Sequence, residues 1–106
     1  EALLRALLRS FRQFARDWPA EFAAAHAQGD HDAGVRLAHT LKGAAANVGA
    51  VQVQAAAAML EAALVAGAEP ARADGRVADC LAALETARTA LDDDGHAETG
   101  TGGAGR

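Results

Sequence analysis

The sequence predicts an all-α protein folded as an antiparallel, up-and-down four-helix bundle. Of its 106 residues, 51% are hydrophobic but only 4% are aromatic, and Ala recurs throughout, a composition that favours closely packed helices over sheets. Apolar residues recur at helical spacing in long segments, and the short loops between these segments place successive helices antiparallel. A chain of this length fits one domain with a modest core, which leaves little room for an enclosed catalytic cleft.

The first helical segment is predicted over residues 1–16. Its apolar side comprises Leu3, Leu4, Leu7, Leu8, Phe11, Phe14 and Ala15. The opposite side carries Arg5, Arg9, Arg12 and Arg16. We interpret these arginines as a solvated helix face, with steering toward an acidic partner as the alternative. A break or kink is expected at Asp17-Trp18-Pro19, after which the renewed helix runs to about Gln28. Trp18 and Phe22 are expected in the core.

A second helix is predicted from about His31 to Val48. Gly29 ends the preceding helix, and Asp30 is the expected N-cap of this one. The helix should stop at Gly49, because glycine readily adopts the left-handed conformation of a C-terminal cap. On a helical wheel its core face comprises Leu37, Ala38, Leu41, Ala44, Ala45 and Val48.

Two more helices are expected. One covers about 50–66 and ends at Gly67, and the other opens at Pro70 and runs to about Leu91. Their predicted inward-facing residues are Val53, Ala57, Leu60, Leu64, Val77, Leu81, Leu84 and Leu91. Cys80, in the last helix, is expected to be a small buried hydrophobe.

The chain divides into residues 1–91, the predicted bundle, and residues 92–106. The second part is acidic and then rich in Thr, Gly and Ala without apolar periodicity, so we expect a disordered tail or linker stub. The chain begins at Glu1 without a Met, which suggests a domain excised from a longer protein. A free-standing protein remains the alternative.

Charge and cysteine content exclude several classes of protein. The formal net charge is −4, which argues against nucleic-acid binding. The charge is uneven: residues 1–48 carry +1 and residues 49–106 carry −5, so a partner that prefers positive potential should meet the first half. A lone Cys allows no internal disulfide, and a cytoplasmic location is the simplest expectation. No apolar run approaches the roughly 20 residues that span a bilayer, so we expect no membrane contact by this domain, although a parent protein could be membrane-anchored.

The outward arc of the helix over 31–48 carries the candidate chemistry. It comprises Val35, His39, Lys42, Gly43 and Ala46. An exposed imidazole is largely uncharged near neutral pH and can use a ring nitrogen as a nucleophile, which suits attack on phosphorus. Lys42, three residues beyond His39, is within helical reach and could balance the charge of a phosphoryl group.

Gly43 lies in the middle of this helix, where glycine is about 1 kcal/mol less favourable than alanine. Side chains tilt toward the helix N-terminus, so a large residue at position 43 would lean over the imidazole of His39. Ala46 also has a small side chain and extends this open surface by one helical turn. Val35 and Ala46 are therefore candidate apolar contacts for a partner that docks around His39.

These residues form a motif. The stretch His39-Thr40-Leu41-Lys42-Gly43, followed by a spaced Gly49, resembles the His-x-x-Lys-Gly motif of histidine phosphotransfer (HPt) domains of two-component phosphorelays. Other stretches that fit the family's pattern are Gly29-Asp30, Leu37-Ala38 and Leu60-Glu61. The resemblance covers roughly residues 3–91.

The resemblance implies a monomeric signal-transduction domain that contacts response-regulator receiver domains. His39 would accept a phosphoryl group from a receiver aspartate and pass it to another receiver, with Lys42 as the nearby cation and Gly43 leaving space. Leu41 matches as a core residue and Gly49 as the turn. The family usually phosphorylates the ring nitrogen farther from the backbone, but the residues of this chain leave the nitrogen open.

The resemblance also implies what the chain does not supply. Mg²⁺ and the acidic pocket that organise transfer would come from the receiver, so no cofactor is expected here. No ATP-binding motif is present, so we expect a phosphocarrier that does not phosphorylate itself and is not an enzyme. Its parent could be a hybrid sensor histidine kinase.

Three alternatives were weighed. A metal site at His26, His31 and His39 is disfavoured because their spacing does not converge. The dimerisation and phosphoacceptor domain of a sensor kinase usually follows its His with an acidic residue and soon a Pro, whereas Thr40 follows here. A catalytically silent docking adaptor for receiver domains stays open. Glu61 has no predicted chemical role, and we expect a structural one.

Overall fold

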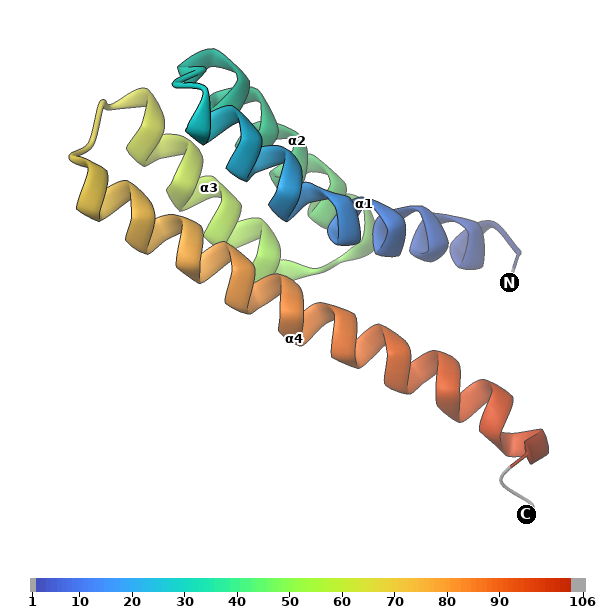
Figure 1. The fold of residues 1–106 in the computed structure, drawn as a ribbon. Helices are drawn as coiled ribbons and strands as arrows, with labels where there is room; N and C mark the ends of the chain where they lie inside the picture. Colours follow the sequence, from blue (N-terminus) through green and yellow to red (C-terminus); the bar gives the residue numbers. More distant parts are fainter. Residues whose placement is uncertain (1, 104–106) are drawn as a thin grey trace.

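The computed structural model describes the backbone of residues 2–103 and the side chains of residues 2–92. The described residues form four helices: α1 (Ala2–Ala27), α2 (His31–Val48), α3 (Val51–Val65) and α4 (Pro70–Gly103). Successive helices run in opposite directions and lie side by side (Figure 1). The predicted all-α, up-and-down four-helix bundle is confirmed.

The three loops each contain a glycine in the left-handed conformation. Gly29, Gly49 and Gly67 have φ angles of 69°, 73° and 71°. Residues with a Cβ atom adopt this conformation only at a cost, which explains why glycine ends each helix here. Asp30 accepts a hydrogen bond from the backbone N–H of Ala33 at 3.0 Å and so caps α2. The predicted bounds of α2 are confirmed.

The core lies between all four helices, and its largest members come from α1 and α2. Trp18 is completely buried and stacks on Phe22 with the ring centroids 5.0 Å apart. The fully buried residues of α2 are Ala38, Leu41 and Ala45, each 0% exposed. Leu37, Ala44 and Val48 pack partly buried against them, so the predicted core face of α2 is confirmed.

Of the break or kink predicted at Asp17-Trp18-Pro19, the break is wrong: α1 runs through these residues and contains Pro19 in its interior. Proline removes one backbone hydrogen bond there, and the burial of the neighbouring Trp18 and Phe22 offsets this local cost. On the apolar side of α1 the first leucines are exposed, Leu3 by 68% and Leu7 by 40%. The first turns of α1 extend past the end of α2 (Figure 1).

The last helix differs from expectation at two places. α4 does not end near Leu91: its backbone is helical to Gly103, beyond the other helices in Figure 1. Residues 104–106 lie outside the described residues, and the division into a bundle and a tail stays a prediction. Leu81 is 40% exposed rather than inward-facing, whereas Leu84 and Cys80 are buried as predicted.

In the described part of the chain, no helix combines the length and apolar character needed to cross a membrane.

Candidate functional site

His39 lies in the middle of α2 and faces outward. Its neighbours Ala38 and Leu41 point into the core, and helical geometry then turns position 39 toward solvent. The imidazole is 67% exposed. The outward phase predicted for this side chain is therefore confirmed.

Glu61 of α3 joins His39 and Lys42 through one carboxylate group. Its Oε2 atom lies 2.8 Å from Nδ1 of His39, and its Oε1 atom lies 2.6 Å from Nζ of Lys42. Glu61 is only 20% exposed and Lys42 is 35% exposed. The two side chains of α2 are thus held from the side by a residue of the next helix.

The bond to Glu61 determines which ring nitrogen of His39 is available. A carboxylate can only accept a hydrogen bond, so Nδ1 must carry the proton that it donates to Glu61. In the neutral ring the lone pair is then on Nε2, at the far edge of an exposed side chain. The arrangement prepares Nε2 as a nucleophile or proton acceptor.

The charges of the site balance one another. The hydrogen bond from Lys42, and after it the hydrogen bond from His39, lower the pKa of Glu61 from its ordinary value of 4.5. Glu61 is consequently ionised near neutral pH and can orient the imidazole. Lys42 donates to this carboxylate, and its predicted part in balancing the charge of a phosphoryl group stays a prediction.

Glu61 is the residue that sequence reasoning missed. It was expected to be structural, yet it contacts both polar residues of the predicted site. The sequence did indicate that Glu61 lies near another helix, because Glu61 follows the buried Leu60 and so lies at the edge of the α3 core face. That signal does not reveal which residues of α2 it meets.

The other predicted site residues lie on the same outward arc of α2. Gly43 is exposed, and a Cβ atom added to it would meet nothing within 4 Å. Ala46 is also exposed, while Val35 is partly buried. The surface one turn beyond His39 is therefore open, and the roles of these three residues stay predictions.

A shallow groove lies between α1 and α2. Its volume is about 390 Å³, and we call it the α1–α2 groove. It is lined by Leu7, Ser10, Phe11, Phe14, Thr40, Ala44, Asn47 and Val48. Thr40 follows His39 in α2, so the groove and the imidazole lie on neighbouring faces of the same turn. Leu7, from the apolar side of α1, is part of the groove.

His26 and Cys80, two other titratable residues, do not join the site. His26 pairs with Asp74 of α4 at 4.0 Å, so it does not converge with His39. Among the described side chains, no group of three His, Cys, Asp or Glu residues could hold a metal ion. Burial raises the pKa of the Cys80 thiol to about 11, helped by the neighbouring Asp79, so this thiol stays protonated near neutral pH.

A comparison with known families adds an independent finding to this geometry. The family model described as "Hpt domain" matches residues 6–95, a segment that contains the whole of α2 and α3. No curated protein and no solved structure matched the chain.

Proposed function

We propose that this chain, which belongs to the family of Hpt domains, accepts a phosphoryl group on His39 from the aspartate of one receiver domain and passes it to another. Hpt domains carry phosphoryl groups between proteins of two-component phosphorelays. The observation that carries the proposal is the hydrogen bond from Nδ1 of His39 to Glu61, which leaves Nε2 as the free nucleophile.

The transfer step follows from this geometry. The lone pair of Nε2 attacks the phosphorus of an aspartyl phosphate, the N–P bond forms, and the bond from phosphorus to the aspartate oxygen breaks. No proton has to leave Nε2, because the ring proton is on Nδ1. The phosphorylated ring keeps that proton and gains positive charge, which the carboxylate of Glu61 balances. A second receiver aspartate reverses the step.

The partner completes the site. In-line transfer needs a cation and an acidic pocket, and we expect the receiver to supply both, with Mg²⁺ as the cation. The chain itself contributes a positioned nucleophile and a docking face, and the proposal gives it no ATP site. It acts as a substrate in each step and not as a catalyst.

The docking face is proposed around the α1–α2 groove. Its lining from α1 includes Leu7, and Leu3, one turn earlier on the same side of α1, is 68% exposed. Arg5 and Arg9 are exposed on the opposite side of α1, where they would steer an acidic partner without contacting the groove. Val35 and Ala46 extend the face along α2.

The cellular setting belongs to the same proposal. We place the chain in the cytoplasm as a monomeric domain, within a hybrid sensor histidine kinase. The family's role in phosphorelays and the lone Cys of the chain support this setting.

Incubation with a phosphorylated receiver domain tests the function. The expected result is transfer of an acid-labile, base-stable label to the wild-type domain and no label on His39→Gln. His26→Gln, at a histidine that is 66% exposed on the far end of α1, is the matched control and should accept the label. Label that persists on His39→Gln would contradict the assignment. Binding of the receiver without any label would favour the silent adaptor.

A further inference from the structure

Trp18 makes a direct hydrogen bond from α1 to the helix that carries His39. Its indole Nε1–H donates to the backbone carbonyl oxygen of Leu37 at 2.9 Å, and the whole side chain is 0% exposed. Leu37 precedes His39 by two residues in α2. The bond therefore connects α1 to the same turn of α2 that presents the imidazole.

This hydrogen bond is sensitive to any sliding of α1 along α2. A carbonyl inside a helix already accepts the N–H of the residue four positions on, and Trp18 uses its second lone pair. A shift by one residue moves a helix by about 1.5 Å, which breaks a 2.9 Å bond and leaves a buried N–H without a partner. The bond thus favours one register of the two helices.

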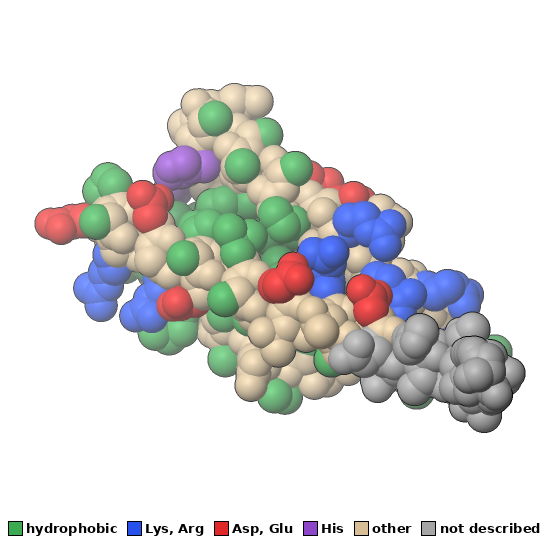
Figure 2. Space-filling view, turned by 60° about the horizontal axis from the view of Figure 1, so that its bottom comes forward, with side chains coloured by type: hydrophobic (Ala, Val, Ile, Leu, Met, Phe, Trp, Pro, Cys, Tyr) green, Lys and Arg blue, Asp and Glu red, His purple; other side chains and the backbone are tan. Residues whose placement is uncertain are grey.

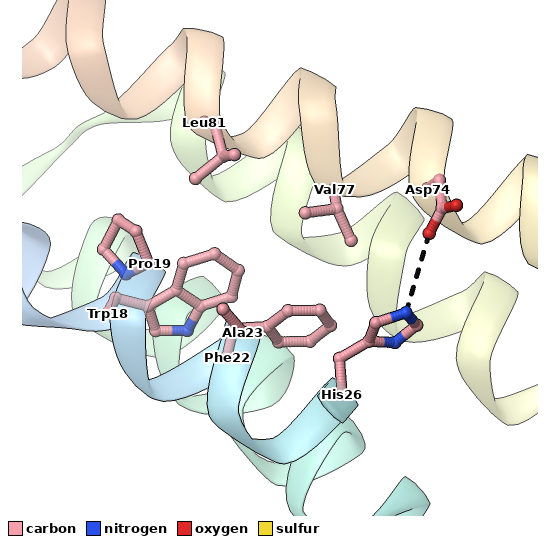
Figure 3. A pocket seen from close by; sticks show the side chains of 8 residues that line it. All are labelled: Trp18, Pro19, Phe22, Ala23, His26, Asp74, Val77 and Leu81. Carbon is pink, nitrogen blue, oxygen red and sulfur yellow. Dashed lines mark ion pairs between the residues drawn. The ribbon is translucent and has the colours of Figure 1, made fainter. Parts of the chain in front are cut away.

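The opposite side of Trp18 provides little restraint. A cavity of about 170 Å³ lies there between α1 and α4, lined by apolar side chains that include Phe22, Val77 and Leu81 (Figure 3). Figure 2 shows hydrophobic side chains at the floor of a hollow on this face. Trp18 is 0% exposed but lines this cavity, so its packing against α4 is incomplete on this side.

The polar contacts between α1 and α4 also allow α1 to shift along its axis. His26 and Asp74 are 4.0 Å apart and both about two-thirds exposed, as Figure 3 shows at the edge of the cavity. Arg12 reaches the carbonyl oxygen of Leu91 at 3.2 Å through a long, flexible side chain. Neither contact would resist a shift of α1 by about one residue as strongly as the short, buried hydrogen bond of Trp18 does.

Register matters because the α1–α2 groove has one wall on each helix. Leu7 and Phe14 come from α1, whereas Thr40 comes from α2 beside His39. We propose that Trp18 is a positioning residue whose bond to Leu37 holds the α1 wall of the docking groove at a fixed place relative to His39. This inference rests on the proposed function.

Trp18→Phe tests the inference with two donors of the phosphoryl group. The variant removes the indole N–H but keeps an aromatic ring beside Phe22. We expect transfer from a phosphorylated receiver, below saturation, to fall by about tenfold, the scale of one buried hydrogen bond. Labelling of His39 by phosphoramidate, a small donor that needs no docking face, should stay within about twofold. Leu84→Ala, a buried change on α4, is the control for lost stability and should retain both reactions while folded.

The outcomes separate the inference from the proposed function. Unchanged receiver-dependent transfer in folded Trp18→Phe would overturn the inference, and so would an equal loss with both donors. Failure of phosphoramidate and receiver alike to label wild-type His39 would instead overturn the proposed function, and the inference with it.

A measurement on the wild-type chain covers the case in which Trp18→Phe does not fold. The chain has one Trp, so its indole N–H gives a single NMR signal. A receiver seated on both walls of the groove should hold α1 and α2 together and slow the exchange of this proton with deuterium several-fold. Unchanged exchange in the saturated complex would overturn the inference.

Discussion

The two sides of α1 are built differently. Toward α2, Trp18 makes a short buried hydrogen bond, and the core residues Ala38 and Ala45 of α2 are 0% exposed. Toward α4, a cavity of about 170 Å³ remains and Leu81 is 40% exposed. The rigid part of the bundle is therefore centred on α2 and α3, which together hold His39 and Glu61. The α1–α4 side contributes less to stability and should tolerate more change.

The largest expected effect is on stability. Leu60→Ala, at a fully buried position of α3, should lower the free energy of unfolding by about 2–5 kcal/mol. Leu81→Ala, beside the cavity, should lower it by less than about 1 kcal/mol because the side chain is already partly in solvent. Denaturant unfolding measures both. Equal losses would remove the distinction between the two sides.

Gly43→Leu tests whether phosphoryl transfer to His39 needs the open surface around position 43 of α2. The fold should persist, because a Cβ atom at position 43 meets nothing within 4 Å. Receiver-dependent transfer should slow by about tenfold or more, since the leucine leans over His39. Gly75→Leu is the matched control: the same substitution at an equally open position on α4 should leave the rate unchanged. An unchanged rate in Gly43→Leu would show the steric argument to be wrong.

The pH dependence of stability tests Glu61. Its pKa in the folded state is lowered below 4.5, mainly by Lys42 and then by His39, so its stabilising contribution is fully present above pH 4.5. That contribution should disappear as the pH falls below 4.5 and through the lowered pKa, because the protonated carboxyl no longer pairs with Lys42. Chemical denaturation of the wild type and of Glu61→Gln from pH 3 to pH 7 provides the comparison. A difference between the two proteins that did not shrink in acid would contradict the assigned charge.

The smallest expected effect comes from adding a methyl group. Val77→Ile should stabilise the fold by about 0.5–1 kcal/mol, because the added carbon enters the α1–α4 cavity. Val53→Ile, at a position that is 1% exposed in α3, should instead destabilise it by about 1 kcal/mol or more through overpacking. Thermal unfolding distinguishes the two, and the same sign at both positions would contradict the difference in packing.

Local features of this fold could be read from the sequence. Asp30 and Gly49 mark the ends of α2 because capping depends on the identity of single residues. The outward phase of His39 follows from the periodicity of the apolar residues around it. These properties depend on neighbours within one helix.

The missed features depend on contacts between helices. Pro19 alone predicts a break, at a cost of about 3 kcal/mol, but burial of Trp18 and Phe22 keeps α1 continuous. Periodicity shows which side of α1 is apolar, but it does not show where the bundle ends. The exposure of Leu3 could therefore not be predicted from the sequence. The contact between Glu61 and His39 depends on the register of α3 against α2, which neither helix encodes by itself.

The central claim is that Nε2 of His39 carries the phosphoryl group while Nδ1 stays bonded to Glu61. NMR of the ¹⁵N-labelled, phosphorylated domain, with coupling to ³¹P, identifies the nitrogen directly. We expect a single N–P bond at Nε2 of His39 and a proton on Nδ1. Phosphorus bonded to Nδ1, or to His26 or His31, would contradict it.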